Sequence, residues 1–179
     1  MKHGVHIFEC LDSDDPGSEG RALKHLFNLM GVESKYSKVD SIDRLLEGIA
    51  NSNFMFAHIS THGSTDGRGE KFKGWWTPSG IGSKARVSKF KGRFKTTAII
   101  STACKSGVSS FGKYVVNELG SRYFIGPKGS PFFFDSFFFA HIFYHKLFIT
   151  KRNVFKAFAS YANAYKNPHK FALFRQNKD

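Results

Sequence analysis

Apolar and polar positions along the chain form two patterns, short apolar runs and longer segments with a helical period. The apolar runs have the length and the β-branched or aromatic content of buried strands. The clearest strands are predicted at residues 4–10, 54–60, 98–102 and 122–126. Residues 33–39 and 170–175 carry a more polar version of the pattern, and we expect the second to be an edge strand.

Helices are predicted between these strands. One has its apolar positions on a single face, and they are Ile42, Leu45, Leu46 and Ile49. Ser41 is its expected N-cap, and Ser18 and Ser109 are expected to cap two further helices, the first ending before Gly31. The last two helices are predicted at about 135–149 and 151–166.

The order of these elements predicts the fold class. Strands that alternate with helices are typical of an α/β fold with a mostly parallel central sheet, here of about five or six strands flanked by helices. Residues 64–82 are rich in glycine and contain Trp75-Trp76, which suggests a small hairpin or flap. No repeat or linker interrupts the pattern, so we expect a single domain over residues 1–179.

The charge distribution bears on partners and location. The formal net charge is +13, and basic residues concentrate in residues 68–95 and 146–179. Such blocks attract polyanions, acidic proteins or anionic lipid, although a solvated basic surface that keeps the protein soluble is the simpler explanation. Two cysteines do not form a disulfide framework, and Asp135, His141 and Lys146 interrupt the richest apolar stretch. We therefore expect a cytoplasmic protein that does not enter a membrane.

Two motifs carry candidate chemistry. Residues 57–63 read Ala-His-Ile-Ser-Thr-His-Gly, and residues 101–107 read Ser-Thr-Ala-Cys-Lys-Ser-Gly, each at the end of a predicted buried strand. In open α/β sheets that edge gathers functional groups. A thiol becomes nucleophilic when an imidazole takes its proton. We therefore expect His62 and Cys104 to form a catalytic dyad, with the backbone N–H groups of Gly63 and Cys104 as oxyanion donors.

These motifs resemble those of caspase-like cysteine peptidases, the group that includes metacaspases, separase and CHAT-type enzymes. In that family one strand ends in His-Gly and a later one in a small residue followed by the nucleophilic cysteine. The resemblance follows the order of elements over most of the chain and implies a caspase-like three-layer sandwich. It also implies an endopeptidase that works without a cofactor, with roles in regulated cell death or defence signalling.

Substrate specificity is predicted from acidic residues. Thr102, two residues before Cys104, matches neither the glutamine of caspases nor the aspartate of metacaspases at the same place in the motif. Carboxylates near the site would favour Lys or Arg before the scissile bond. Asp12, Asp14 and Asp135 are the candidates, together with Thr102, although turn formation also explains the acidic loop.

Other residues have simpler explanations. His58 and His62 lie on a strand and a turn without an evident third ligand, so no metal site is predicted. Cys10 is expected to be buried structure.

The leading hypothesis is a peptidase that cleaves protein substrates and is released by a sensor protein or a small-molecule signal, with residues 64–95 as its regulatory segment. The alternative is a non-catalytic caspase-fold module that binds nucleic acid or an acidic protein. Its main support is that Phe90 and Phe94 interleave with basic residues between Lys84 and Lys95.

Overall fold

A six-stranded sheet forms the centre of the protein, which is described here in a computed structural model over residues 1–12, 15, 19–164 and 170–177. The strand order is β2-β1-β3-β7-β8-β9. All neighbouring pairs are parallel except β8 with β9, so the mostly parallel α/β sheet and its last edge strand are confirmed, and the structure adds that this edge strand is antiparallel. The strands are β1 (Lys2–Glu9), β2 (Ser34–Lys38), β3 (Phe54–Ser60), β7 (Ala98–Ser101), β8 (Tyr123–Pro127) and β9 (Phe171–Arg175).

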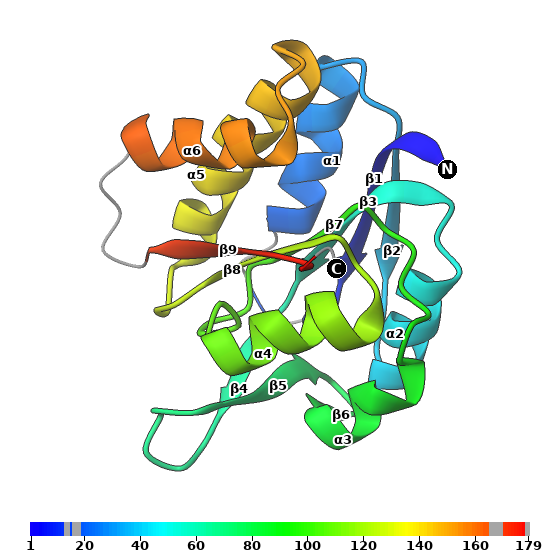
Figure 1. The fold of residues 1–179 in the computed structure, drawn as a ribbon, viewed down its shortest axis with the longest axis vertical. Coiled ribbons are helices and arrows are strands. Elements are labelled where there is room, and N and C mark those ends of the chain that lie inside the picture. Colours follow the sequence, from blue (N-terminus) through cyan, green and yellow to red (C-terminus); the bar gives the residue numbers. More distant parts are fainter. Residues whose placement is uncertain (13–14, 16–18, 165–169, 178–179) are drawn as a thin grey trace.

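Helices cover both faces of this sheet, as Figure 1 shows. On one face lie α1 (Glu19–Leu29), α5 (Phe133–Tyr144) and α6 (Val154–Ala164), which pack around the buried Phe139 and Phe143. On the other face lie α2 (Ile42–Ala50) and α4 (Ser109–Tyr114), which pack around Leu45 and Phe111. The chain therefore forms helix, sheet and helix layers with an apolar core on each side of the sheet.

Local signals explain most helix ends. Ser41 accepts a hydrogen bond from Arg44 N at 3.4 Å, as predicted for an N-cap. Gly31 has φ +65° just after α1, where glycine adopts the left-handed conformation without strain. Ser109 is the first residue of α4 rather than its cap, because Val108 has the extended backbone of the N-cap position. The predicted cap Ser18 lies outside the described residues.

Two of the helices continue past their α-helical residues in a different helical form. A π-helical turn extends α4 through Val115–Leu119, and another extends α5 through His145–Ile149. The extended α5 thus begins two residues before the predicted range and ends where predicted, because the apolar pattern continues through the π turn. No described helix has the length and apolar content to span a bilayer.

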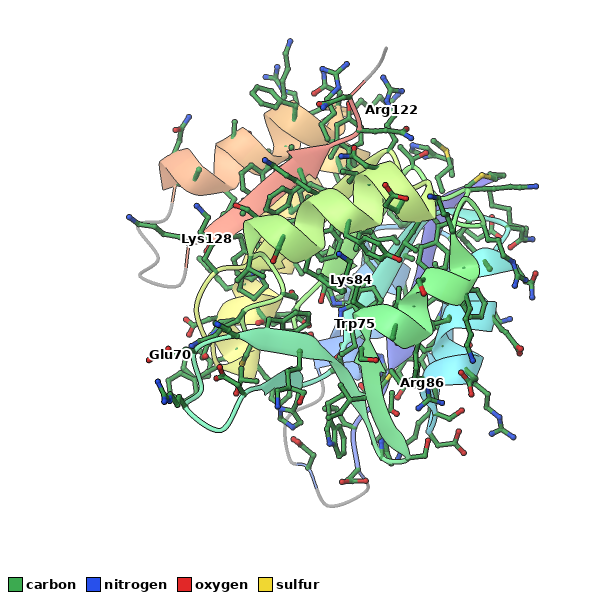
Figure 2. The ribbon with its side chains drawn as sticks, turned by 60° about the horizontal axis from the view of Figure 1, so that its bottom comes forward. Glu70, Trp75, Lys84, Arg86, Arg122 and Lys128 are labelled. Carbon is green, nitrogen blue, oxygen red and sulfur yellow. The ribbon has the colours of Figure 1, made fainter. Side chains whose placement is uncertain are left out.

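A second, three-stranded antiparallel sheet is inserted between β3 and β7. It contains β4 (Gly63–Thr65), β5 (Phe72–Thr77) and β6 (Gly80–Ser83), and the short helix α3 (Lys84–Val87) follows. The hairpin predicted around the two tryptophans is therefore confirmed as β5–β6. Trp75, labelled in Figure 2, is completely buried, and its Nε1 donates to Ser101 Oγ at 3.0 Å. This contact anchors the small sheet to β7, so it does not form a detached flap.

Candidate active site

The tips of β3 and β7 meet at Gly63 and Cys104. The two strands are parallel neighbours, with Ile59 opposite Ser101. A Cβ atom added to Gly63 would lie 1.9 Å from the carbonyl oxygen of Cys104 and 3.0 Å from its nitrogen. Only a residue without a side chain allows this approach. The His-Gly pair and the cysteine, 42 positions apart in the sequence, are thus in direct backbone contact.

The imidazole of His62 has two aromatic rings and a carboxylate as neighbours. Its ring centroid is 5.8 Å from that of Trp76 and 5.4 Å from that of Phe133. Its Nε2 lies 2.6 Å from Oδ2 of Asp15 in the loop after β1. A carboxylate partner favours the proton on Nε2, which leaves Nδ1 of His62 as the ring nitrogen that can accept a proton.

Asp15 belongs to the acidic loop after β1, and its contact with His62 is not predicted from the sequence. The sequence predicts the carboxylates of this loop as substrate ligands, whereas the structure places one of them against the histidine. The signal was present, since a carboxylate at the end of β1 lies at the same sheet edge as the tip of β3. Which acidic residue of the loop reaches His62 depends on the loop's path, which periodicity does not reveal.

Cys104 occupies a tight turn that is held by backbone hydrogen bonds. Lys105 N donates to Gly129 O at 2.7 Å, and Gly107 N donates to Pro127 O at 2.8 Å. Lys105 has φ +59°, a left-handed conformation that costs a non-glycine residue about 1–2 kcal/mol. Its Nζ also donates to Gly69 O. The nucleophile candidate is partly exposed on this turn, whereas its neighbours Ala103 and Ser106 are buried.

Two backbone N–H groups are predicted as oxyanion donors, those of Gly63 and Cys104. Trp76 N donates to His62 O at 3.0 Å, so the next pair, Gly63 with Trp75, is of the non-hydrogen-bonded type. The Gly63 N–H therefore points away from β5. Within the described part of the chain, the Cys104 N–H has no hydrogen-bond acceptor. An N–H group beside a thiol can stabilise the oxyanion of a tetrahedral intermediate if it is free to donate.

A buried polar network surrounds Thr102, two residues before Cys104. Thr102 is 4% exposed, and its single hydroxyl proton is shared between two acceptors within reach, Ile59 O and Oε1 of Glu19. His58 Nε2 is 3.6 Å from the same Glu19 oxygen, and its Nδ1 is 3.1 Å from the hydroxyl of Tyr144. Burial raises the pKa of Tyr144 well above its ordinary value, so this hydroxyl keeps its proton.

The remaining residues predicted to bind substrate are Asp12, Asp14 and Asp135, and each has its own position in the chain. Asp12 is exposed in the loop after β1, and Asp14 lies outside the described residues. Asp135 accepts a hydrogen bond from Phe132 N at 3.3 Å in the first turn of α5. The structure therefore places Glu19, which was not predicted, beside Thr102, while the carboxylate of Asp135 helps to cap a helix.

The second cysteine is an unsuitable nucleophile. Cys10 is completely buried, as predicted, and burial together with nearby Glu9 raises the pKa of its thiol to about 12. Within the described ranges, no three His, Cys, Asp or Glu side chains come together in a group that could hold a metal ion.

The aromatic and basic residues that suggested nucleic-acid binding have other positions in the fold. Phe90 is 7% exposed and Phe94 is 1% exposed, and both pack in the core, so they cannot stack on bases. Figure 2 shows the basic residues Lys84, Arg86, Arg122 and Lys128 spread over the view rather than gathered in one stripe. The basic residues between positions 84 and 95 therefore lack the exposed aromatic rings on which a protein stacks the bases of single-stranded nucleic acid.

Comparison with known proteins adds no family assignment. No protein-family model matches the chain, and no curated protein matches it either. The functional interpretation therefore depends on the geometry of the site and on the resemblance of its motifs.

Proposed function

We propose that this protein is a cysteine endopeptidase of the caspase-like type, with Cys104 as nucleophile and His62 as general base and acid. The observation that carries the proposal is the contact between Gly63 and the Cys104 backbone. That contact brings an imidazole held by Asp15 to the edge of the turn that presents the thiol. A base, its orienting carboxylate and a partly exposed nucleophile are the parts that acyl transfer needs.

The residues support a complete acyl-enzyme cycle. His62 takes the proton of Cys104 Sγ, and the thiolate attacks the carbonyl carbon of the scissile peptide bond. The N–H groups of Gly63 and Cys104 bind the resulting oxyanion. The protonated His62 then gives its proton to the leaving nitrogen, the C–N bond breaks, and a thioester remains. A water molecule, deprotonated by His62, attacks the thioester, and the Cys104 sulfur leaves and is reprotonated.

Asp15 acts in this cycle through His62. A carboxylate at 2.6 Å holds the ring in one tautomer and stabilises the imidazolium that forms after proton transfer. Asp15 is therefore a positioning residue rather than a group that touches the substrate.

The arrangement of the sheet supports the caspase-like assignment. The histidine follows β3 and the cysteine follows β7, its parallel neighbour, with helices on both faces of the sheet. We extend the proposal to the biological setting that the resemblance implies, a cytoplasmic effector in cell-death or defence signalling that acts on protein substrates. Its activation would come from a sensor protein or a small-molecule signal.

An electrophilic peptide probe tests the proposed activity. We expect a peptidyl chloromethyl ketone to add one covalent mass to the wild-type protein, mapped to Cys104 by peptide mass spectrometry. Cys104→Ala should abolish the adduct, and His62→Ala should slow its formation strongly, while Cys10→Ala should react like the wild type. Labelling that occurs at Cys10, or that is indifferent to His62, would exclude the dyad.

A further inference from the structure

A pocket lies at the edge of the central sheet opposite the dyad. Its volume is about 550 Å³, within the range of roughly 300–1,000 Å³ that is common for small-molecule sites. Its walls include Met55 near the start of β3, Thr97 just before β7 and Tyr123 at the start of β8. Because these strands are parallel and the dyad follows the ends of β3 and β7, the pocket and the dyad lie at opposite edges of the sheet.

Three arginines line this pocket, and they come from three different parts of the chain. Arg122 precedes β8, Arg152 lies between the π turn that extends α5 and the start of α6, and Arg175 ends β9. Among the described residues, no aspartate or glutamate lines the pocket, and none of the three guanidinium groups forms an ion pair. Positive charges around one space without a counter-charge favour the binding of an anion.

Backbone hydrogen bonds hold the starts of the strands together at this pocket. Thr97 N donates to Met55 O at 2.7 Å, and Tyr123 N donates to Thr97 O at 3.0 Å. Tyr123 is also the partner of Arg175 in the antiparallel pairing of β8 with β9. The guanidinium of Arg122 lies over the Tyr123 ring, 5.5 Å from its centroid. Two of the three arginines are therefore attached to a rigid sheet, which reduces the entropy lost when a ligand binds.

The N-terminus of α6 forms another side of the pocket. Asn153, Val154 and Phe155 line it there. Asn153 Oδ1 accepts a hydrogen bond from Lys156 N at 2.9 Å, as a helix cap does. The N-terminus of this 11-residue helix carries partial positive charge, which adds to the attraction for an anion. Phe155 is 63% exposed, so an anion in the pocket has an aromatic face beside it.

We propose that this pocket binds a nucleoside phosphate, with the phosphate held by the three arginines and the base stacked on Phe155. A guanidinium binds phosphate oxygens through two parallel N–H donors. An aromatic side chain stacks on any base, so the ring favours a nucleoside over an aliphatic phosphate. Inorganic phosphate by itself would leave most of the pocket and the exposed ring unused. The proposal is independent of the peptidase chemistry, because none of these residues belongs to the dyad.

Calorimetric titration of the full chain tests the site. ADP, GDP and UDP are titrated separately in low-salt buffer, where the attraction between charges is least screened. We expect at least one of them to bind with a stoichiometry of one per chain. Pyrophosphate and the matching nucleoside should each bind at least about 10-fold more weakly than the nucleotide, because each keeps only one of the two sets of contacts.

Variants assign the binding to the pocket. Arg152→Gln and Arg175→Gln should each weaken nucleotide binding by about 10- to 100-fold, as the loss of a charge-assisted hydrogen bond implies. Phe155→Ala should weaken nucleotide binding by about 5- to 100-fold and leave pyrophosphate binding unchanged. Lys128→Gln removes the same charge at the other end of β8 from Arg122, both labelled in Figure 2, and should bind like the wild type. All four substituted side chains are exposed, and circular dichroism checks that each variant is folded.

Two results of the titration would overturn the proposal. One is failure of all three nucleotides to bind to folded protein. The other is an equal loss of binding in Lys128→Gln and Arg152→Gln, because binding would then follow the overall charge. Nucleotide binding in a protein whose Cys104 is unreactive would support this site and count only against the peptidase.

A lipid headgroup is a second source of an organic phosphate, and a vesicle assay distinguishes it from a nucleotide. The chain is sedimented with phosphatidylcholine vesicles that do or do not contain phosphatidylinositol 4-phosphate. We expect no retention that depends on this lipid. Retention on the phosphoinositide vesicles without binding of any nucleotide would assign the arginines to a headgroup and overturn the nucleoside assignment.

Discussion

Asp15 Oδ2 lies 2.6 Å from Nε2 of His62, and this contact joins the loop after β1 to the tip of β3. The side chain of Asp15 is 17% exposed, and that of His62 is 46% exposed. The pair is therefore reachable by substrate while the carboxylate is partly shielded from water, which strengthens its hold on the ring.

Removing the charge of Asp15 should impair catalysis with little effect on the fold. We expect Asp15→Asn to lower the rate of peptide hydrolysis by about 10- to 1,000-fold, because the imidazolium loses its partner and the ring can take the wrong tautomer. The alkylation rate of Cys104 by iodoacetamide at neutral pH, measured without any substrate, should fall too. Asp12→Asn, in the same loop, should leave that alkylation rate unchanged; an equal effect of both variants would contradict the role of Asp15.

The two cysteines should differ sharply in reactivity. Burial raises the pKa of Cys10 to about 12, so almost none of it is thiolate at neutral pH, whereas Cys104 is partly exposed. We expect iodoacetamide to alkylate Cys104 in the folded protein and both residues in urea. Tryptic mapping after a time course measures this. Modification of Cys10 first, under native conditions, would show that the fold around β1 is not as described.

Adding one methyl group at Gly63 should disturb the site. In Gly63→Ala the new Cβ would lie 1.9 Å from the Cys104 carbonyl oxygen, so the tip of β3 and the catalytic turn must move apart. We expect a loss of about 1–3 kcal/mol in the free energy of unfolding and a loss of activity. Gly67→Ala, whose Cβ meets nothing within 4 Å, is the matched control and should change stability by less than about 0.5 kcal/mol. Urea denaturation of the two variants measures the difference.

Acid should destabilise the protein through His6. Burial, and secondarily the charge of Lys35, lowers the pKa of His6 from 6.5 to about 4. Between these two values the unfolded chain binds a proton that the folded protein does not. The stabilising contribution is therefore complete above about pH 6.5 and is lost as the pH falls toward 4; it amounts to roughly 2 kcal/mol. The neutral ring lies within hydrogen-bond distance of Ser52 and Ser37.

The measurement compares urea unfolding at pH 7 and at pH 4.5. His6→Gln should be less stable than the wild type at pH 7, and the gap should shrink at pH 4.5. His25→Gln, which changes an exposed histidine, should follow the wild type at both values. A gap that stays constant with pH would contradict this account of His6.

Several elements were predictable because local patterns determine them. The strand Phe54–Ser60 has the predicted bounds, and α2 starts after its predicted cap, because apolar spacing and a serine hydroxyl act within a few residues. The prediction of Ser109 as a cap was wrong by one residue, because Val108 has the extended backbone of the N-cap position and no side chain forms a cap hydrogen bond there. The π turns that prolong α4 and α5 have no sequence signature in their apolar spacing.

The sequence by itself determined the α/β class, the parallel sheet and the two strand tips that carry His62 and Cys104. Only the tertiary structure decided that Asp15 orients His62 and that Glu19 lies beside Thr102. The physical reason is the separation along the sequence over which each kind of interaction acts. Periodicity and capping arise from neighbours a few positions apart, whereas these pairs join residues 47 and 83 positions apart. Such contacts depend on how loops and helices pack across the edge of the sheet, and no local pattern encodes that packing.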